Sequence, residues 1–157
     1  MSRSIGDRLP HDVMAAFDGR DLERKIGLAF PLVTVDADGS PRTCLLSMGE
    51  VLAVDDKVMR IVLWAGTRTA RNLRASRPAL FTYLGPDVVY HIRGQARPLP
   101  GTASVPAERF ALGVSSVETD RHAGMPVVNT ITFGVTSEDR PVVLRRWRGQ
   151  LDDLRRP

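Results

Sequence analysis

Apolar and polar positions alternate along much of the chain in short runs, which is the pattern of half-buried strands. The runs are rich in Val, Ile, Leu, Thr and Phe, and Gly, Pro and Asp, which favour turns, separate them. In 36–41, Asp38-Gly39 supplies the positive φ that a tight reversal needs. We expect Gly49 and Gly94 to mark bends or bulges within strands. The pattern predicts six strands, at residues 28–36, 42–54, 57–64, 78–84, 88–98 and 129–135.

Helical periodicity is confined to shorter segments. One of them ends before Pro78, because a residue that precedes proline avoids helical ψ. Beyond Pro141 the apolar positions fit a strand that finishes as a helix. The predicted helices are 10–18, 21–25, 67–76 and 106–112.

Six short strands joined by hairpins, with a helix after the third, predict a small antiparallel barrel. A doubly wound parallel sheet would need a helix after nearly every strand, and the chain does not supply them. The length of 157 residues fits a single domain, 1–157, without an internal repeat or linker. The predicted fold class is therefore mainly β, a β-barrel with a few helices.

Composition bears on the cellular compartment and on membrane association. No apolar run approaches the roughly 20 residues that span a bilayer, and the first residues lack the apolar core of a signal peptide. The single cysteine, Cys44, excludes an internal disulfide framework and is expected to be a packing residue rather than a nucleophile. We expect a soluble, cytoplasmic protein that does not associate with membranes.

The formal net charge of +4 raises the question of nucleic acid, since 20 of the 22 basic residues are arginine. Acidic residues are interspersed almost everywhere except in the tail, at 145–148 and 155–156. No nucleic-acid module matches the spacing, so nucleic acid is an unlikely partner. His11, His91 and His122 lie far apart without metal-ligand spacing, so no metal site is predicted.

The richest candidate chemistry lies in 61–73, where an apolar strand breaks at Gly66 and a helix begins. Thr67, Arg68 and Thr69 would place hydroxyls, a guanidinium and free backbone N–H groups in the first turn, which together suit a phosphate group. The alternative is a strand–helix junction that Thr67 caps, with Arg68 and Arg71 in solvent.

Two short motifs resemble the pyridoxamine 5′-phosphate oxidase-like family, the FMN-binding split barrels. Arg42-Thr-Cys-Leu-Leu-Ser47 resembles the family strand Arg-x-x-Leu-Leu-Lys, and Thr67-Arg-Thr-Ala70 resembles its Ser-Arg-Lys-x stretch. The resemblance covers 28–99, and the order and spacing of the motifs also match. It implies a six-stranded antiparallel split barrel of Greek-key type. It also implies a flavin (FMN)-dependent oxidoreductase that acts on an unidentified small molecule.

By the same resemblance, Arg42 and Arg68 would contact the FMN phosphate, and the two threonines of the helix start would add donors. Asn72 is expected on the helix surface or as the cap of an adjacent loop, or it reaches the same phosphate. The family site lies at a two-fold interface, which implies a homodimer. The implied cofactor-binding residues are Arg42, Leu45, Leu46, Ser47, Val62, Leu63, Thr67, Arg68, Thr69 and Asn72.

The chain also departs from the family pattern. Ser47 and Thr69 stand where relatives often carry basic residues. Val89 or one of its neighbours stands where the oxidases carry glutamine, and the substrate-binding signature of the tail is missing. We therefore do not expect a true pyridoxamine phosphate oxidase. A deazaflavin cofactor is a close variant, and a non-catalytic binding protein for storage, sensing or stress response is the alternative. A haem-handling relative is disfavoured, and no catalytic residue is named because a flavin itself carries the hydride.

Overall fold

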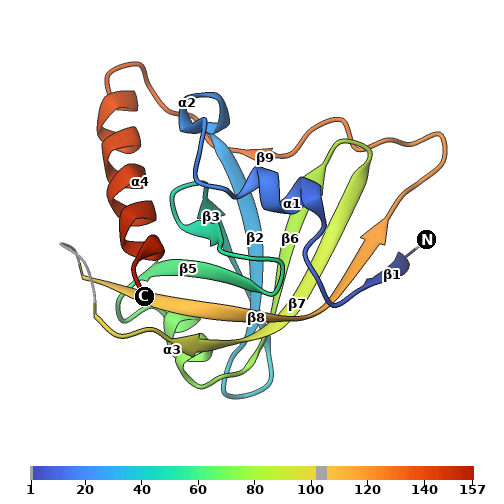
Figure 1. The fold of residues 1–157 in the computed structure, drawn as a ribbon, viewed down its shortest axis with the longest axis horizontal. Coiled ribbons are helices and arrows are strands. Elements are labelled where there is room, and N and C mark those ends of the chain that lie inside the picture. The colour runs from blue at the N-terminus through green and yellow to red at the C-terminus, as the bar shows by residue number, and fades with distance from the viewer. Residues whose placement is uncertain (1, 102–105) are drawn as a thin grey trace.

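The computed structural model describes residues 2–101 and 106–157. Its strands form one antiparallel sheet that curls into a split barrel (Figure 1). The order across the sheet is β3-β2-β6-β7-β8-β5-β4, with β1 paired to β8 and β9 paired to β2. The strands are β1 Ser2–Gly6, β2 Leu28–Val35, β3 Pro41–Ser47, β4 Val51–Ala53, β5 Val58–Trp64, β6 Pro78–Gly85, β7 Val88–Pro98, β8 Ala107–Asp120 and β9 Ile131–Thr132.

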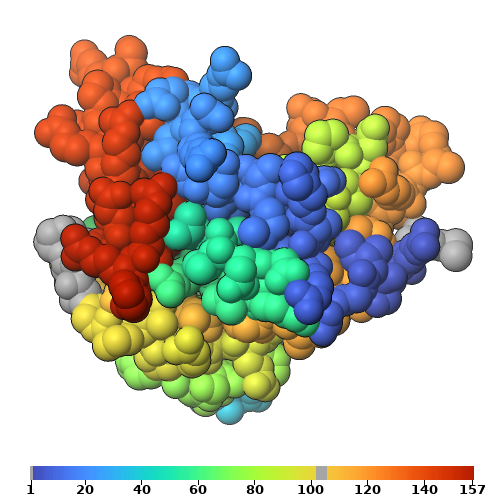
Figure 2. Space-filling view, viewed as in Figure 1, coloured from blue at the N-terminus to red at the C-terminus, as the bar shows by residue number. Residues whose placement is uncertain are grey.

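Four helices in the described residues surround the sheet: α1 His11–Ala16, α2 Leu22–Lys25, α3 Arg68–Arg74 and α4 Arg140–Arg155. α3 and α1 lie towards opposite ends of the barrel (Figure 1). α4 (red) stands along one side beside α2 (Figures 1 and 2), and Arg148 of α4 forms an ion pair with Glu23 of α2. No helix among the described residues has the length and apolar character of a membrane span.

An aromatic cluster closes the interior of the barrel. Phe17, directly after α1, is fully buried and meets three rings edge-on. Its ring centroid lies 4.8 Å from that of Phe30 and 5.2 Å from that of Phe81. Tyr83 follows at 5.3 Å. Because edge-to-face aromatic pairs are favourable beyond the area that they bury, α1 is held firmly against the sheet.

The predicted fold class is confirmed: the protein is mainly β, with an antiparallel split barrel and a few helices. The number of strands differs, since nine rather than six occur in the described residues. β1 carried no sequence signal, because all five of its residues are exposed and it is held by pairing with β8. The strand predicted at 129–135 is reduced to Ile131–Thr132.

The helix predicted at 106–112 is wrong, because these residues begin the longest strand, β8. β8 pairs with β7 on one side and β5 on the other, and Phe110 and Leu112 are fully buried. Hydrogen bonding along both edges outweighs the local helical preference of Ala-Glu-Arg-Phe-Ala-Leu. The bulge predicted at Gly94 is confirmed by the register shift between Arg93 and Gly94 in the β7–β8 ladder.

The strand predicted at 42–54 is two strands, β3 and β4, separated by a tight turn. Glu50 closes this turn, since its carboxylate accepts the Ser47 amide at 2.6 Å and the Ser47 hydroxyl at 2.8 Å. Gly49 lies against α4, and a Cβ added there would meet the Trp147 side chain at 2.3 Å.

The tail beyond Pro141 is helical throughout, so the strand predicted at its start is wrong. Leu144, Trp147, Leu151 and Leu154 are buried and follow the helical repeat. Trp147 is 3% exposed and also packs edge-on against Phe133, with centroids 6.4 Å apart. Burial of this stripe on the barrel outweighs the β preference of Val142 and Val143.

Candidate functional site

α3 begins where the sequence predicts it, after the positive-φ turn at Gly66. The Thr67 hydroxyl accepts the Ala70 amide at 3.2 Å and donates to the Trp64 carbonyl at 3.0 Å. This confirms Thr67 as the N-cap and fixes the helix to the end of β5. Ala70 and Leu73 are fully buried, so the opposite flank of α3 faces outward.

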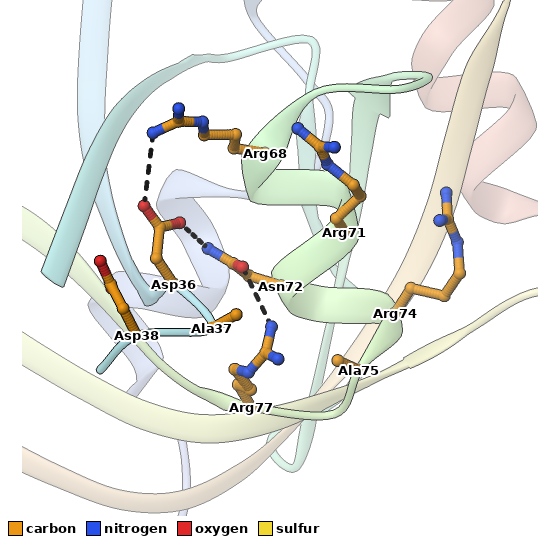
Figure 3. Close-up of a pocket in the computed structure, with 9 residues that line it drawn as sticks. All are labelled: Asp36, Ala37, Asp38, Arg68, Arg71, Asn72, Arg74, Ala75 and Arg77. Atoms are coloured by element: carbon orange, nitrogen blue, oxygen red, sulfur yellow. Dashed lines mark hydrogen bonds and ion pairs between the residues drawn. The ribbon is translucent and has the colours of Figure 1, made fainter. Parts of the chain in front are cut away.

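Asp36, directly after β2, has three of the predicted site residues around its carboxylate, two of which, Arg68 and Asn72, are drawn in Figure 3. Asn72 donates to Asp36 Oδ1 at 2.8 Å, and Arg42 Nε donates to Oδ2 at 3.0 Å. Arg68 forms a longer ion pair, with its Nη1 3.7 Å from the same Oδ2. Arg42 lies on the strand beside β2, directly opposite Thr34 in the ladder. The fold therefore brings Arg42, Arg68 and Asn72 together.

Asn72 is 4% exposed, so among the places predicted for it the helix surface is wrong, whereas its bond to Asp36 at the start of the turn after β2 agrees with the cap of an adjacent loop. Its side chain also donates to Thr34 Oγ1 at 3.0 Å, which fastens α3 to β2. The Asn72 amide and the Arg42 guanidinium hold the pKa of Asp36 below its usual range. Asp36 is therefore ionised at neutral pH and keeps the two guanidinium groups in place.

A pocket of about 770 Å³ opens between α3 and the turn after β2 (Figure 3). Its walls carry four arginines at intervals of three residues, Arg68, Arg71, Arg74 and Arg77. The other lining residues are Asp36, Ala37, Asp38, Asn72 and Ala75. This composition suits an anionic ligand of small-molecule size.

The four arginines are restrained to different degrees. Arg74 is paired with Glu108 of β8, and Arg77 donates to the amide oxygen of Asn72 at 3.2 Å. Among the described residues Arg68 has only its long contact with Asp36, and its side chain is 63% exposed. Within the described part of the chain, no hydrogen bond or ion pair is formed by the Arg71 guanidinium.

The apolar residues of the implied cofactor-binding set lie in varied surroundings. Leu46, Val62 and Leu63 are 2%, 3% and 6% exposed, so their side chains belong to the core. Leu45, in contrast, is 54% exposed on edge strand β3. The Val62 amide donates to the Glu50 carbonyl at 3.0 Å. Contact with a cofactor through the three core residues would therefore involve backbone atoms.

Ser47 and Thr69 are also engaged within the protein. Both donors of Ser47 are directed to the Glu50 carboxylate, and burial raises the pKa of Glu50. Thr69 is 6% exposed, and its hydroxyl lies beside the Cys44 thiol, whose pKa burial raises. The Cys44 thiol is therefore protonated at neutral pH, which agrees with its predicted role as a packing residue.

Sequence reasoning missed Asp36, Glu50, Arg71 and Arg77 as parts of this region. The Ser47-x-x-Glu50 spacing, which resembles a capping box, is a signal for the turn. The three-residue interval of Arg68, Arg71 and Arg74 is a signal for neighbouring positions on one helix, and Arg77 follows that helix. Asp36 had no such signal, because its role depends on the contact between α3 and the end of β2.

Two pairs of titratable groups lie elsewhere in the fold. His91 Nε2 lies 3.0 Å from Asp120 Oδ2 on neighbouring strands. The Tyr90 hydroxyl donates to Asp12 at 2.6 Å, and burial together with this carboxylate raises the pKa of Tyr90 to about 12. Across 2–101 and 106–157, no group of three His, Cys, Asp or Glu residues is arranged to hold a metal ion.

Solved structures with a similar fold include HupZ of Group A Streptococcus, at a TM-score of 0.54 and 13% identity over 80% of this chain and 99% of that chain. A heme binding protein from Mycobacterium smegmatis aligns at 0.51, with 15% identity over 74% of this chain and 57% of that chain. The FAD and heme binding protein of the same organism aligns at 0.50, with 14% identity over 87% and 80%. At such low identity these similarities establish the fold and not the function.

No family model matches the chain. The uncharacterized protein YclD of Bacillus subtilis (strain 168) is 32% identical over 141 residues, which cover 88% of this chain and 90% of YclD. Identity of this degree over nearly the whole of both chains indicates common descent. The chain therefore belongs to the same protein family as YclD.

Proposed function

We propose that the protein binds a phosphorylated flavin, FMN in the first place, and acts as an oxidoreductase on a small molecule. The observation that carries the proposal is the convergence of Arg42 and Arg68 on one carboxylate beside the arginine-lined pocket. Both arginines stand in the two motifs that resemble the FMN-binding split barrels. The split-barrel fold supports the same cofactor class.

The side chains present fit a phosphate group. Arg68 is largely exposed and its 3.7 Å pair with Asp36 is weak, so its guanidinium can turn towards a dianion at little cost. Arg42 is engaged with Asp36 through Nε. A phosphate at this point would form charge-assisted, bidentate bonds of the kind that arginine favours.

The threonines of the helix start serve a different purpose from the one first predicted. The Thr67 hydroxyl already donates to Trp64, so it holds α3 in position rather than offering a proton to a ligand. Thr69 is buried against Cys44. The binding free energy for the phosphate would therefore come mainly from the two guanidinium groups.

A bound flavin supplies hydride or electron transfer through its own ring, and the protein positions it and limits access of water. Leu45, which is 54% exposed on β3, offers apolar surface to such a ring. A deazaflavin would use the same phosphate contacts. Reduction of the bound cofactor by NADH or NADPH, followed by stopped-flow spectroscopy, separates an oxidoreductase from a non-catalytic binder.

Replacing Arg68 with alanine should weaken FMN binding by about 2 kcal/mol, because a charge-assisted bond to the phosphate is lost. Isothermal titration of the purified protein with FMN measures the change. Arg145→Ala, which removes an exposed arginine from α4, is the matched control and should leave the affinity unchanged. Equal affinities of the wild type and Arg68→Ala would place the phosphate elsewhere, and a wild type without FMN affinity would refute the proposed cofactor.

The protein also works, in this proposal, as a homodimer that completes the cofactor site at its interface. The outer face of β2 and β6 is apolar, with Val33, Val35 and Leu80 only partly covered and Leu45 exposed on neighbouring β3. Apolar area of this kind marks an interaction surface. The edge of β3 away from β2 has no partner strand among the described residues.

Leu80→Glu should convert the dimer to a monomer, because it would bury an unpaired carboxylate in the interface. Sedimentation velocity across a hundredfold range of concentration measures the state of association. Val142→Glu changes an exposed apolar residue of α4 instead and should leave the dimer intact. A wild-type protein that remains monomeric over the whole range would exclude the interface.

A further inference from the structure

We infer that the pocket beside α3 binds a ligand with at least two phosphate groups, through Arg71 and Arg77, at a subsite separate from the proposed cofactor phosphate. The inference rests on the proposed function only in assigning Arg68 and Arg42 to the cofactor. A diphosphate, as found in nucleotides, is the chemical class that the pocket fits.

The arginines extend too far along the pocket to serve one phosphate. Arg68 and Arg74 stand at the two ends of α3, about 9 Å apart at the helical rise of 1.5 Å per residue. Arg77 follows the helix and points back towards Asn72, into the pocket (Figure 3). Arg68 belongs to the end of the pocket near Arg42. Arg71 and Arg77 lie on either side of Asn72, with the Arg71 guanidinium turned towards the Arg68 end and that of Arg77 at the far end (Figure 3).

The charges in and around the pocket do not cancel. Asp36 is shared by Arg42 and Arg68, and Glu108 is taken by Arg74. The carboxylate of Asp38, at the pocket wall, accepts the backbone amide of Ser40 at 2.9 Å. The region thus has five guanidinium groups and three carboxylates. These are Arg42, Arg68, Arg71, Arg74 and Arg77 on one side and Asp36, Asp38 and Glu108 on the other.

Arg71 and Arg77 hold this excess of positive charge. Arg77 has a neutral amide oxygen as its partner, and Arg71 has no polar partner among the described residues. Two arginines without a carboxylate, in a concave pocket, favour an anion over a cationic or neutral ligand.

The shape of the site indicates a small molecule rather than a nucleic acid or a protein. A volume of about 770 Å³ lies within the range of ordinary ligand pockets. The adjacent surface of β2 and β6 is apolar and does not continue the positive charge along a strand of nucleic acid. A compact ligand with several negative charges satisfies both the volume and the charge.

Isothermal titration of the full chain with inorganic pyrophosphate tests the inference. We expect pyrophosphate to bind at least tenfold more tightly than orthophosphate, since it engages both arginines at once. Arg71→Gln and Arg77→Gln should each lower the affinity for pyrophosphate about tenfold. Arg145→Gln, an exposed arginine of α4, is the matched control and should change it less than twofold. Circular dichroism of all variants establishes that they are folded.

Equal affinity for pyrophosphate and orthophosphate would overturn the inference, as would equal affinities of Arg71→Gln and the wild type. Citrate provides a further arm, because it carries several carboxylates without phosphate. Citrate binding as tight as that of pyrophosphate would show that the pocket selects ligands by negative charge alone, and it would overturn the assignment to phosphates.

Repeating the titration in saturating FMN separates this inference from the proposed function. Pyrophosphate binding that persists beside FMN supports two subsites, whereas competition between them would reduce the pocket to a single anion site and overturn the inference. If FMN does not bind but pyrophosphate binding still depends on Arg71, the proposed cofactor fails and the diphosphate site stands.

Discussion

Replacing Arg109 with methionine should lower the free energy of unfolding by about 4 kcal/mol, because several carbonyl groups, that of Asp153 in a buried position, lose a charged donor at once. Arg109 lies on β8 and is only 6% exposed. Its guanidinium donates to the carbonyls of Asp153 at 2.6 Å and Gly101 at 3.1 Å, and also to that of Pro100. Methionine preserves much of the aliphatic packing but none of these hydrogen bonds.

The carbonyls that Arg109 satisfies include those at the C-terminal end of α4, where backbone acceptors have no partner within the helix. Arg60, on neighbouring β5, donates to the carbonyls of Leu154 at 2.8 Å and Arg156 at 2.6 Å. Two strands therefore hold the end of one helix by arginine side chains, and loss of Arg109 should loosen α4 as well as lower the overall stability.

Urea unfolding at neutral pH, followed by circular dichroism, measures this loss. Arg148→Met is the matched control, since it removes an exposed arginine of α4 that pairs with Glu23 on the surface. Surface ion pairs contribute little, so the control should unfold close to the wild type. Similar losses in both variants would mean that Arg109 acts only through its overall charge and not through its bonds to these carbonyls.

Alanine at position 94 should cost about 3 kcal/mol, because the close approach of two strands leaves no room for a side chain. A Cβ at Gly94 would lie 2.1 Å from the carbonyl oxygen of Gly113 on β8. This neighbour is backbone and cannot turn aside, so β7 and β8 would have to separate at the bulge. The variant should therefore lose pairing in the centre of the sheet.

Thermal and urea unfolding of Gly94→Ala test this expectation. Gly149→Ala is the control, because a Cβ there meets no atom within 4 Å and alanine favours the helix more than glycine does. The control should be as stable as the wild type or more so. A stable Gly94→Ala protein would show that the bulge can relax without disturbing the strands on either side.

Strand content could be predicted from the sequence where each strand carried its own signal. The segments at 28–36, 57–64, 78–84 and 88–98 alternate apolar and polar residues between turns, and each forms a strand within a residue or two of the predicted bounds. In residues 106–112 and in the tail, the local sequence pattern and the observed element disagree. Their local preference was overruled by partners distant in sequence, β5 and β7 in one case and the barrel surface in the other.

The candidate site could be predicted only in part, for the same reason. Arg42, Arg68 and Asn72 were named from the motifs, and the structure brings them together. Asp36, which binds all three, was predicted only as part of the turn at 36–41. Its partners come from β3 and α3, so the neighbouring sequence does not reveal them. A carboxylate that works through tertiary contacts leaves no pattern in the residues next to it.

The fluorescence of Trp147, which packs on Gly49, allows the docking of α4 to be followed without an added label. Of the two tryptophans, Trp147 is 3% exposed between α4 and the barrel, whereas Trp64 is 48% exposed at the end of β5. A buried indole emits at shorter wavelength and is shielded from iodide, while an exposed one is quenched. The emission of a Trp64→Phe protein therefore follows the docking of α4 alone, and the iodide-sensitive part of the wild-type emission follows the strand that leads into α3.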